Sequence, residues 1–267
     1  MKSITDPPDD SSLSPEERLR FARPLRLPEV GEAGQVRLRA ASVLVVGAGG
    51  LGSSALLHLA ASGVGRIGIV DPDTVTLDNL HRQILHGMPG LGLPKVQSAR
   101  RRLAEIHPQT VFDLYPVTLD EVNAGELARP YRIIVDGSDN LAARKVVNRT
   151  CIQQGKPMVY GTAQRFEGQM AVFDALRGPC YRCIFPDPLD PHKIESPAET
   201  GVFGPLPGII GTLQALAAMK IFLDIGDSPY GRLLIFDGLS GEFRSLRVRK
   251  NPQCPECGSV VKNTTES

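Results

Sequence analysis

The sequence predicts an α/β fold with a Rossmann-like, mostly parallel sheet that is extended by antiparallel strands and carries a four-cysteine zinc site. Three observations support this prediction. A glycine-rich turn follows a short apolar run, apolar runs alternate with helical patterns over the first two thirds of the chain, and two C-x-x-C pairs lie far apart. Alternating strands and helices are typical of parallel sheets, because each parallel connection needs a crossover.

The chain has 267 residues, which is long enough for one large α/β domain. Residues 1–14 are acidic and rich in serine and proline, so we expect a disordered leader there. Residues 15–267 are expected to form a single domain. Its nucleotide-binding half covers about 40–165, and its zinc-binding half covers about 166–260.

Charge and hydropathy argue against two classes of partner. The net charge is +1, so no broad basic field favours nucleic acid or anionic lipid. The longest apolar stretch, Leu206–Leu223, contains Pro207, Gly211 and Lys220, and it predicts a buried amphipathic helix better than a membrane span. The N-terminus does not resemble a signal peptide, so we expect a cytoplasmic protein without membrane contact.

The first strand and helix units follow the apolar pattern closely. Ser42–Val46 predicts a buried parallel strand, Leu51–Ser62 a helix, and Arg66–Val70 a second strand that ends in Asp71. Further expected elements are helices at Lys95–Glu105 and Leu141–Gln154, strands at Val111–Tyr115, Ile133–Asp136 and Met158–Gly161, and antiparallel strands at Gln169–Phe173, Leu233–Asp237 and Phe243–Val248.

The glycine turn predicts a nucleotide. Its glycines let the backbone turn sharply and approach phosphate or ribose, and a helix N-terminus favours an anion. Asp71 at the end of the second strand can accept hydrogen bonds from ribose hydroxyls. Taken alone, this arrangement favours NAD or FAD over ATP.

Two cations beyond the acidic residue favour a triphosphate instead. Arg82 can bind phosphate oxygens as a fork, and Lys95 can act as a point charge. The turn at 136–140 follows a parallel strand, at the sheet edge where ligands bind. A carboxylate there beside phosphates, Asp139, is best explained by Mg²⁺.

Cysteine spacing predicts the zinc site. Cys180, Cys183, Cys254 and Cys257 can complete a tetrahedral four-thiolate shell, which leaves no open position for water and is therefore structural. The fifth cysteine, Cys151, lies within a helical pattern and is expected to be a small buried hydrophobe.

The motifs VVGAGGLGS, DPDTV, NLHRQ, LGLPKV, DGSDN, CYRC and NPQCPECG, in this order, resemble those of the MoeB/ThiF/HesA family, the bacterial relatives of ubiquitin-activating enzymes. The resemblance covers nearly the whole chain. It implies a homodimeric adenylyltransferase that activates a small ubiquitin-like sulfur carrier. ATP and the carrier's C-terminal Gly-Gly carboxylate would give an acyl-adenylate and pyrophosphate, in molybdenum cofactor or thiamine biosynthesis. The half of the domain at about 166–260 would also bind the carrier.

The resemblance also assigns roles to residues. It implies that Asp71 holds the ribose, that Asn79, Arg82 and Lys95 contact phosphates, and that Asp139 serves Mg²⁺ and transfer. The motifs and the resemblance together give a nucleotide site of Gly47, Gly49, Gly50, Gly52, Asp71, Asp73, Asn79, Arg82, Gln83, Lys95, Asp139 and Asn140, with Arg23, Arg82, Lys95 and Asp139 as catalytic residues.

Three further segments carry expectations from the resemblance. Leu19–Arg23 looks like the family's RYxRQ element, whose second arginine reaches the partner's ATP site, although Pro24 replaces the glutamine. The segment Pro186–Gly204 is expected to cross over the carrier's tail. Many relatives carry a cysteine within the run that corresponds to Glu195–Val202, whereas this chain has none, so chemistry is expected to stop at the adenylate.

Two other classes of function remain open at this point. A NAD-dependent oxidoreductase would use the glycine turn but leave Arg82 and Lys95 without a role. A non-catalytic regulatory subunit of an activating enzyme would be expected to have lost ATP-site residues, which are present here. The sequence does not choose between a molybdopterin, a thiamine and another thiolation carrier.

Overall fold

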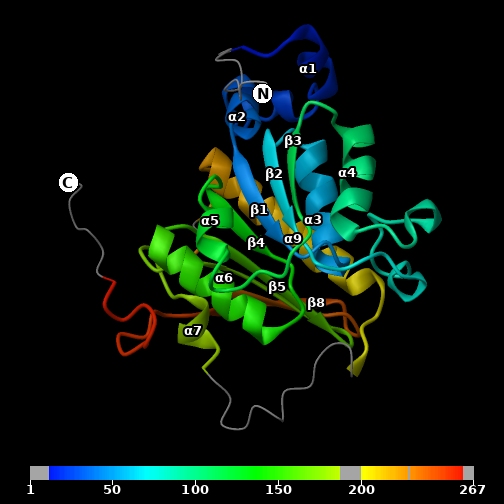
Figure 1. Ribbon diagram of the computed structural model, residues 1–267. Coiled ribbons are helices and arrows are strands. Elements are labelled where there is room, and N and C mark those ends of the chain that lie inside the picture. Colours follow the sequence, from blue (N-terminus) through cyan, green and yellow to red (C-terminus); the bar gives the residue numbers. More distant parts are fainter. Residues whose placement is uncertain (1–11, 187–199, 228, 261–267) are drawn as a thin grey trace.

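The computed structural model describes residues 12–186, 200–227 and 229–260, and it is organised around one eight-stranded sheet (Figure 1). The strands are β1 (Ser42–Val46), β2 (Arg66–Val70), β3 (Val111–Tyr115), β4 (Ile133–Asp136), β5 (Met158–Gln164), β6 (Glu167–Phe173), β7 (Arg232–Asp237) and β8 (Glu242–Arg247). The sheet runs through both of the halves expected from the sequence.

The strand order is β3-β2-β1-β4-β5-β6-β7-β8. The first five strands pair in parallel, and β6, β7 and β8 continue the sheet as antiparallel neighbours. This confirms the predicted mixed sheet. Strand β5 is longer than expected, because its last residues pair with the start of β6 as far as Gln164 and Glu167.

Helices cover both faces of the sheet. They are α1 (Pro15–Arg20), α2 (Gly31–Arg39), α3 (Gly50–Ala61), α4 (Lys95–Ile106), α5 (Ala124–Ala128), α6 (Leu141–Gln154), α7 (Tyr181–Ile184) and α9 (Pro205–Leu223), with short 3-10 turns at Pro24–Arg26, Leu77–Asn79 and Met88–Gly90. Helices α2, α3, α4 and α9 pack on one face, and α5, α6 and α7 pack on the other (Figure 1).

The central strand shows why the fold forms two cores. Val43 and Val45 of β1 join the core under α3 and α9, whereas Leu44 and Val46 join the core under α6. All four side chains are at most 4% exposed. A buried parallel strand needs apolar residues at every position, which explains its continuous apolar run.

Helix α9 corrects one expectation. The sequence predicted an amphipathic helix, but Ile209 and Leu216 are exposed while the opposite side packs against α3 and the sheet. The helix is therefore apolar on both sides. It is long and apolar enough to cross a membrane by composition alone, yet 56% of its most apolar window is buried within the fold. We therefore interpret α9 as a core helix.

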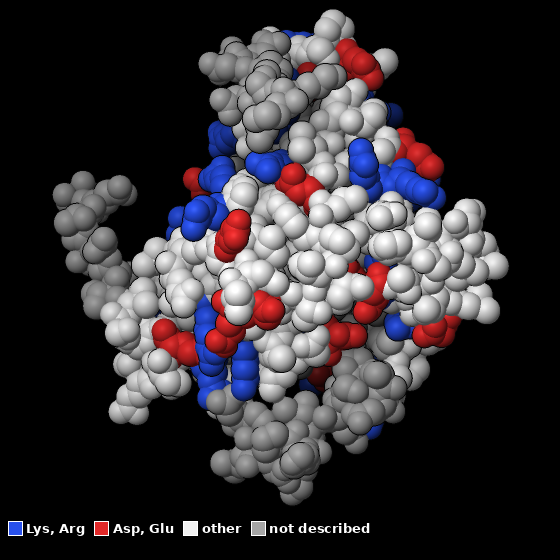
Figure 2. Space-filling view, in the orientation of Figure 1, with Lys and Arg blue, Asp and Glu red and all other residues white. Residues whose placement is uncertain are grey.

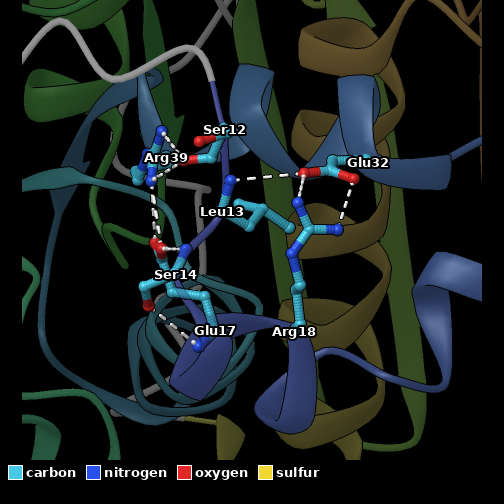
Figure 3. A network of polar contacts seen from close by, with 7 residues as sticks. All are labelled: Ser12, Leu13, Ser14, Glu17, Arg18, Glu32 and Arg39. Carbon is cyan, nitrogen blue, oxygen red and sulfur yellow. Dashed lines mark hydrogen bonds and ion pairs between the residues drawn. The ribbon is translucent and has the colours of Figure 1, made fainter.

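The segment before β1 is tied down by polar contacts (Figure 3). Ser14 caps α1 by accepting from the Glu17 N–H, and Glu17 accepts in return from the Ser14 N–H, which is a capping box. Arg39 of α2 donates to Glu17 at 3.0 Å, and Arg18 donates to Glu32 at 2.6 Å. Residues 1–11 of the expected leader lie outside the described residues.

Acidic and basic side chains are interspersed on the face shown in Figure 2. Lysine and arginine clusters there lie next to aspartate and glutamate, as the near-neutral net charge predicts.

Candidate functional site

A cavity of about 770 Å³ opens at the carboxyl ends of the parallel strands. Ten of the predicted nucleotide-site residues line it: Gly47, Gly49, Gly50, Asp71, Asp73, Arg82, Gln83, Lys95, Asp139 and Asn140. They come from the segments that follow β1, β2 and β4, so the sheet topology brings them together from distant parts of the sequence. Ligands of open α/β sheets bind at this edge.

Close backbone packing explains two of the glycines. Gly47 has a φ of +92°, and a Cβ there would lie 2.7 Å from the Gly137 carbonyl oxygen. A Cβ at Gly52 would lie 1.9 Å from the Gly47 carbonyl oxygen. Gly52 does not line the cavity, so it lets α3 pack against the loop. Gly49 and Gly50 line the cavity, and Gly50 also packs against Pro207, whose Cβ would lie 2.8 Å from a Cβ on that glycine.

Asp71 holds the glycine-rich turn at residues 47–52, which we call the glycine loop. Its Oδ2 accepts from the Ala48 N–H at 2.7 Å, and its Oδ1 accepts from the Asp73 N–H at 2.9 Å. Burial raises the pKa of Asp71, against the opposing effects of Lys95 and these two hydrogen bonds. Each carboxylate oxygen has a second lone pair, so a ribose hydroxyl can still donate to it.

Lys95 is buried and paired with carboxylates. Its Nζ lies 2.8 Å from Asp73 Oδ2 and 3.9 Å from Asp71 Oδ1, and its side chain is only 8% exposed. The Lys95 N–H also donates to the Asp73 carbonyl oxygen at 2.8 Å. Lys95, the cation predicted to contact a phosphate, therefore lines the cavity. A phosphate bound there would interact with an ammonium group that is already paired with these two carboxylates.

The segment after β2 places Arg82 but not Asn79 in the cavity. Arg82 is partly exposed, and its Nη1 donates to the Asp78 carbonyl oxygen at 3.0 Å. Asn79 is buried outside the lining, and its Oδ1 has no hydrogen-bond partner among the described residues. Gln83 lies next to Gly49, and a Cβ on that glycine would be 3.7 Å from Gln83 Nε2.

The turn after β4 separates a buried acid from an exposed one. Asp136 is fully buried, which raises its pKa, and its Oδ1 accepts from the Ser138 hydroxyl at 2.6 Å. Asp139 is exposed at the cavity, so it is free to contact a metal ion. Asn140 begins α6, where its Oδ1 accepts from the Ala143 N–H at 2.9 Å.

Several residues of this site were not predicted. The lining also includes Val117, Thr118, Leu119, Arg144 and Thr162. Arg144 donates to the Ser138 carbonyl oxygen and to Thr162 Oγ1, and its guanidinium lies 5.3 Å from the Tyr160 ring centroid. The signal for Arg144 was its position one helical turn after the Asn140 cap, which directs it back toward the loop.

Arg23 is not brought to this cavity. The preceding Phe21 is buried beside His107 and Gly63, which lie in the loops that lead into β3 and β2. These loops lie at the amino edge of the parallel strands (Figure 1), whereas residues at the carboxyl edge line the cavity. Arg23 is exposed. Any role of Arg23 at a nucleotide would therefore require a second copy of the chain.

The four predicted cysteines form a compact cluster. Their sulfur atoms all lie within 4.8 Å of one another, with Cys180 and Cys254 at 3.6 Å and Cys183 and Cys257 at 3.4 Å. Thiolates about 2.3 Å from a tetrahedral ion would be about 3.8 Å apart, so the cluster can hold a metal ion. None of the four lines the cavity, which agrees with a structural site.

Burial raises the pKa of the Cys257 and Cys151 thiols, whereas a reactive cysteine has a lowered pKa. Burial raises the pKa of Cys257 to about 11, so a metal ion would have to displace its proton. Burial also raises the pKa of Cys151, which is 5% exposed and packs in the core under α6. Cys151 is thus the buried hydrophobe that the sequence predicted, and it does not line the cavity.

Comparison with known proteins gives matches over most of the chain. Residues 21–256 match the ThiF family. The chain is 48% identical over 248 residues to a sulfur carrier protein adenylyltransferase of Thermus thermophilus, covering 91% of this chain and 92% of that protein. It is 46% identical to the adenylyltransferase and sulfurtransferase MOCS3 of Mus musculus, covering 93% of this chain and 54% of MOCS3. The chain thus spans about half of MOCS3.

Solved structures share the fold at lower identity. E. coli MccB determined with ATP has a TM-score of 0.74 and 20% identity, covering 84% of this chain and 69% of MccB. PaaA has a TM-score of 0.76 and 18% identity, covering 94% of this chain and 79% of PaaA. These likenesses confirm the fold class that the sequence predicted.

Proposed function

This chain belongs to the ThiF family, as its motifs predicted, and we propose that it transfers AMP from ATP to the C-terminal Gly-Gly carboxylate of a small sulfur-carrier protein. The 48% identity to the Thermus thermophilus adenylyltransferase, over nearly its full length, supports this activity. The observation that carries the proposal is the cavity at the carboxyl edge, which combines a glycine loop, a ribose-type acid, two cations and an exposed carboxylate.

The proposed reaction needs no general base. A carboxylate has an unperturbed pKa of about 4 and is already ionised at neutral pH. One of its oxygens attacks the α-phosphorus, the bond from the α-phosphorus to the bridging oxygen breaks, and pyrophosphate leaves with that electron pair. The protein's contribution is placement of the two substrates and stabilisation of charge on the phosphates.

The residues divide this work by position. The N-terminus of α3 at Gly49 and Gly50 offers N–H groups to phosphate oxygens. Arg82 and Lys95 line the same cavity as the glycine loop and would supply positive charge. Asp71 can bind ribose while it keeps the loop in place through Ala48.

Two metal ions belong to the proposal. Asp139, exposed at the cavity, would hold Mg²⁺, which neutralises the charge of the triphosphate when bound. The four cysteines would hold Zn²⁺, because a shell of four thiolates at these separations suits its tetrahedral geometry. That ion would join the 180–183 turn to the C-terminal turn at 254–257 and act only in stability.

We also place a homodimer in the mechanism. Arg23 is exposed at the edge of the sheet opposite its own cavity, so it would act in the partner's site. Arg23→Ala and Asp139→Ala should each be inactive and should complement when mixed, since one site of a mixed dimer is wild type. Random pairing should restore about a quarter of the sites. No recovered activity, despite proven subunit exchange, would remove Arg23 from the mechanism.

The first test of the proposed activity is carrier-dependent ATP–pyrophosphate exchange. We expect exchange with a carrier that ends in Gly-Gly and none with a carrier that lacks the final glycine. Asp139→Asn should reduce exchange at least a hundredfold, by about 2.7 kcal/mol, because it removes a metal ligand. Asp227→Asn, a change of the same kind at an exposed residue outside the cavity, should have no effect.

Two outcomes would contradict the proposal. Tight binding of NADH without carrier-dependent exchange would favour an oxidoreductase. If wild-type protein binds the carrier but catalyses no ATP–pyrophosphate exchange, that result would favour a regulatory subunit. The same exchange assay, run with different carriers, tests whether the carrier serves molybdenum cofactor, thiamine or another thiolation. We also propose a cytoplasmic location for the protein. Residues 187–199 of the expected crossover segment, Pro186–Gly204, lie outside the described residues.

A further inference from the structure

His86 is a buried histidine beside the cavity, and neither the motifs nor the proposed mechanism gives it a role. It is 8% exposed, and both of its ring nitrogens have partners. Nε2 lies 2.9 Å from the Ala48 carbonyl oxygen, and Nδ1 lies 2.9 Å from the Ser98 hydroxyl. The ring thus connects α4 to the glycine loop.

The two partners fix the tautomer of the ring. A carbonyl oxygen can only accept, so Nε2 must carry the proton and donate to Ala48. In the neutral ring Nδ1 is then an acceptor, and the Ser98 hydroxyl donates to it. Burial lowers the pKa of His86, which keeps this neutral form.

Ala48 is therefore held on both sides. Its N–H donates to Asp71 Oδ2 at 2.7 Å, and its carbonyl oxygen accepts from His86. In a planar trans peptide, the carbonyl and the following N–H point in opposite directions. Because His86 fixes the Ala48 carbonyl, the Gly49 N–H is directed away from His86, toward the cavity that Gly49 lines. No described residue accepts a hydrogen bond from the Gly49 N–H.

We propose that His86 is a positioning residue that orients the Ala48–Gly49 peptide so that the Gly49 N–H donates to a phosphate of the bound nucleotide. The proposal rests on the proposed function, since it requires a nucleotide phosphate at the glycine loop. His86 itself does not touch the nucleotide. Its effect should depend on the phosphates of the ligand and not on the adenosine part.

The test compares MgATP with adenosine by equilibrium binding to the full chain. His86→Phe keeps a ring but removes the donor, and it should weaken MgATP binding about tenfold while adenosine binding changes less than about twofold. His86→Gln should recover most of the affinity, because its amide nitrogen can reach the position of Nε2. His86→Asn is one bond shorter and should not recover it, which gives a second comparison if the Phe variant does not fold.

A matched control is available in His107. This histidine is also buried, its pKa is also lowered by burial, and its Nδ1 lies 3.0 Å from the Thr110 hydroxyl, but it is at the opposite edge of the sheet. His107→Phe should lower thermal stability without changing the affinity for MgATP.

The outcomes separate the two proposals. A wild-type chain that binds no MgATP would contradict the proposed function itself. If a folded His86→Phe variant, or His86→Asn, binds MgATP as tightly as the wild-type chain, that result would overturn the role of His86. Equal weakening of MgATP and adenosine would also overturn it, because that result indicates a general structural role.

Discussion

Alanine substitutions at two glycines of the same loop should affect different properties: Gly52→Ala should lower stability, and Gly49→Ala should lower MgATP affinity. Gly52→Ala would place a Cβ 1.9 Å from the Gly47 carbonyl oxygen, more than 1 Å inside the 3.0 Å limit of real Cβ contacts. Gly47 itself packs closely against the turn after β4, where even a Cβ would lie 2.7 Å from the Gly137 carbonyl oxygen, so we expect the loop to have little room to shift. We expect a loss of about 3 kcal/mol of stability, equivalent to a fall in Tm of roughly 6–12 °C.

Gly49→Ala should fold normally, since the nearest atom to its Cβ is Gln83 Nε2 at 3.7 Å. The added methyl would project into the cavity and keep phosphate from the backbone, so MgATP affinity should fall at least about tenfold, or about 1.4 kcal/mol. The Tm should stay within about 2 °C.

Calorimetric unfolding and equilibrium MgATP binding measure both effects. Gly125→Ala, in α5 and outside the cavity, is the control, because its Cβ would meet only Gln154 Nε2 at 3.9 Å. It should change neither quantity beyond about 1 kcal/mol. The reasoning would be refuted if Gly49→Ala bound MgATP as tightly as wild type, or if Gly52→Ala were as stable as wild type.

Three further predictions concern the metal, the lone thiol and pH. Metal analysis should return about one zinc per chain, and Cys254→Ser should lower Tm before it changes MgATP affinity; metal retained at full stoichiometry after all four cysteines are replaced would contradict this. Cys151→Ala should leave pyrophosphate exchange nearly intact, because that thiol is buried and its pKa is raised; a carrier conjugate on Cys151 would oppose it. Burial holds the pKa of His86 and of His107 below 6.5, so the unfolded chain protonates first and their contribution to stability is lost as pH falls below 6.5. Urea midpoints between pH 8 and 5 should therefore decline less steeply in His107→Gln, and an identical slope would count against this origin.

The fold was predictable because its signals are local. The continuous apolar run of β1, the glycine turn after it and the Asn140 cap of α6 each specify one element from a few neighbouring residues. The cysteine cluster was equally accessible, since the C-x-x-C spacing itself sets the bite of two ligands.

The site was less predictable where it depends on tertiary packing. Asn79 was expected at the phosphates, and the structure buries it outside the cavity lining, with its Nδ2 3.3 Å from Asp78 Oδ2. His86 carries no pattern that distinguishes it from an ordinary polar residue, and its contact with the loop after β1 appears only once the sheet is assembled. The position of Arg144 one helical turn after the Asn140 cap was a weak signal, and its contact with the loop after β4 depends on the same assembly. Helix α9 shows the same limit. The sequence predicted an amphipathic helix, but Ile209 and Leu216 are apolar and exposed, and only the assembled fold shows which side of the helix is buried.

The central claim is that this chain forms an acyl-adenylate on another protein. Mass spectrometry of a Gly-Gly carrier, incubated with the enzyme, ATP and Mg²⁺ without a sulfur donor, tests it most directly. We predict that the carrier gains the mass of one AMP at its C-terminus, that pyrophosphate is released, and that Asp139→Asn gives neither product. An unmodified carrier together with ADP and phosphate, or AMP attached to the enzyme itself, would contradict the account.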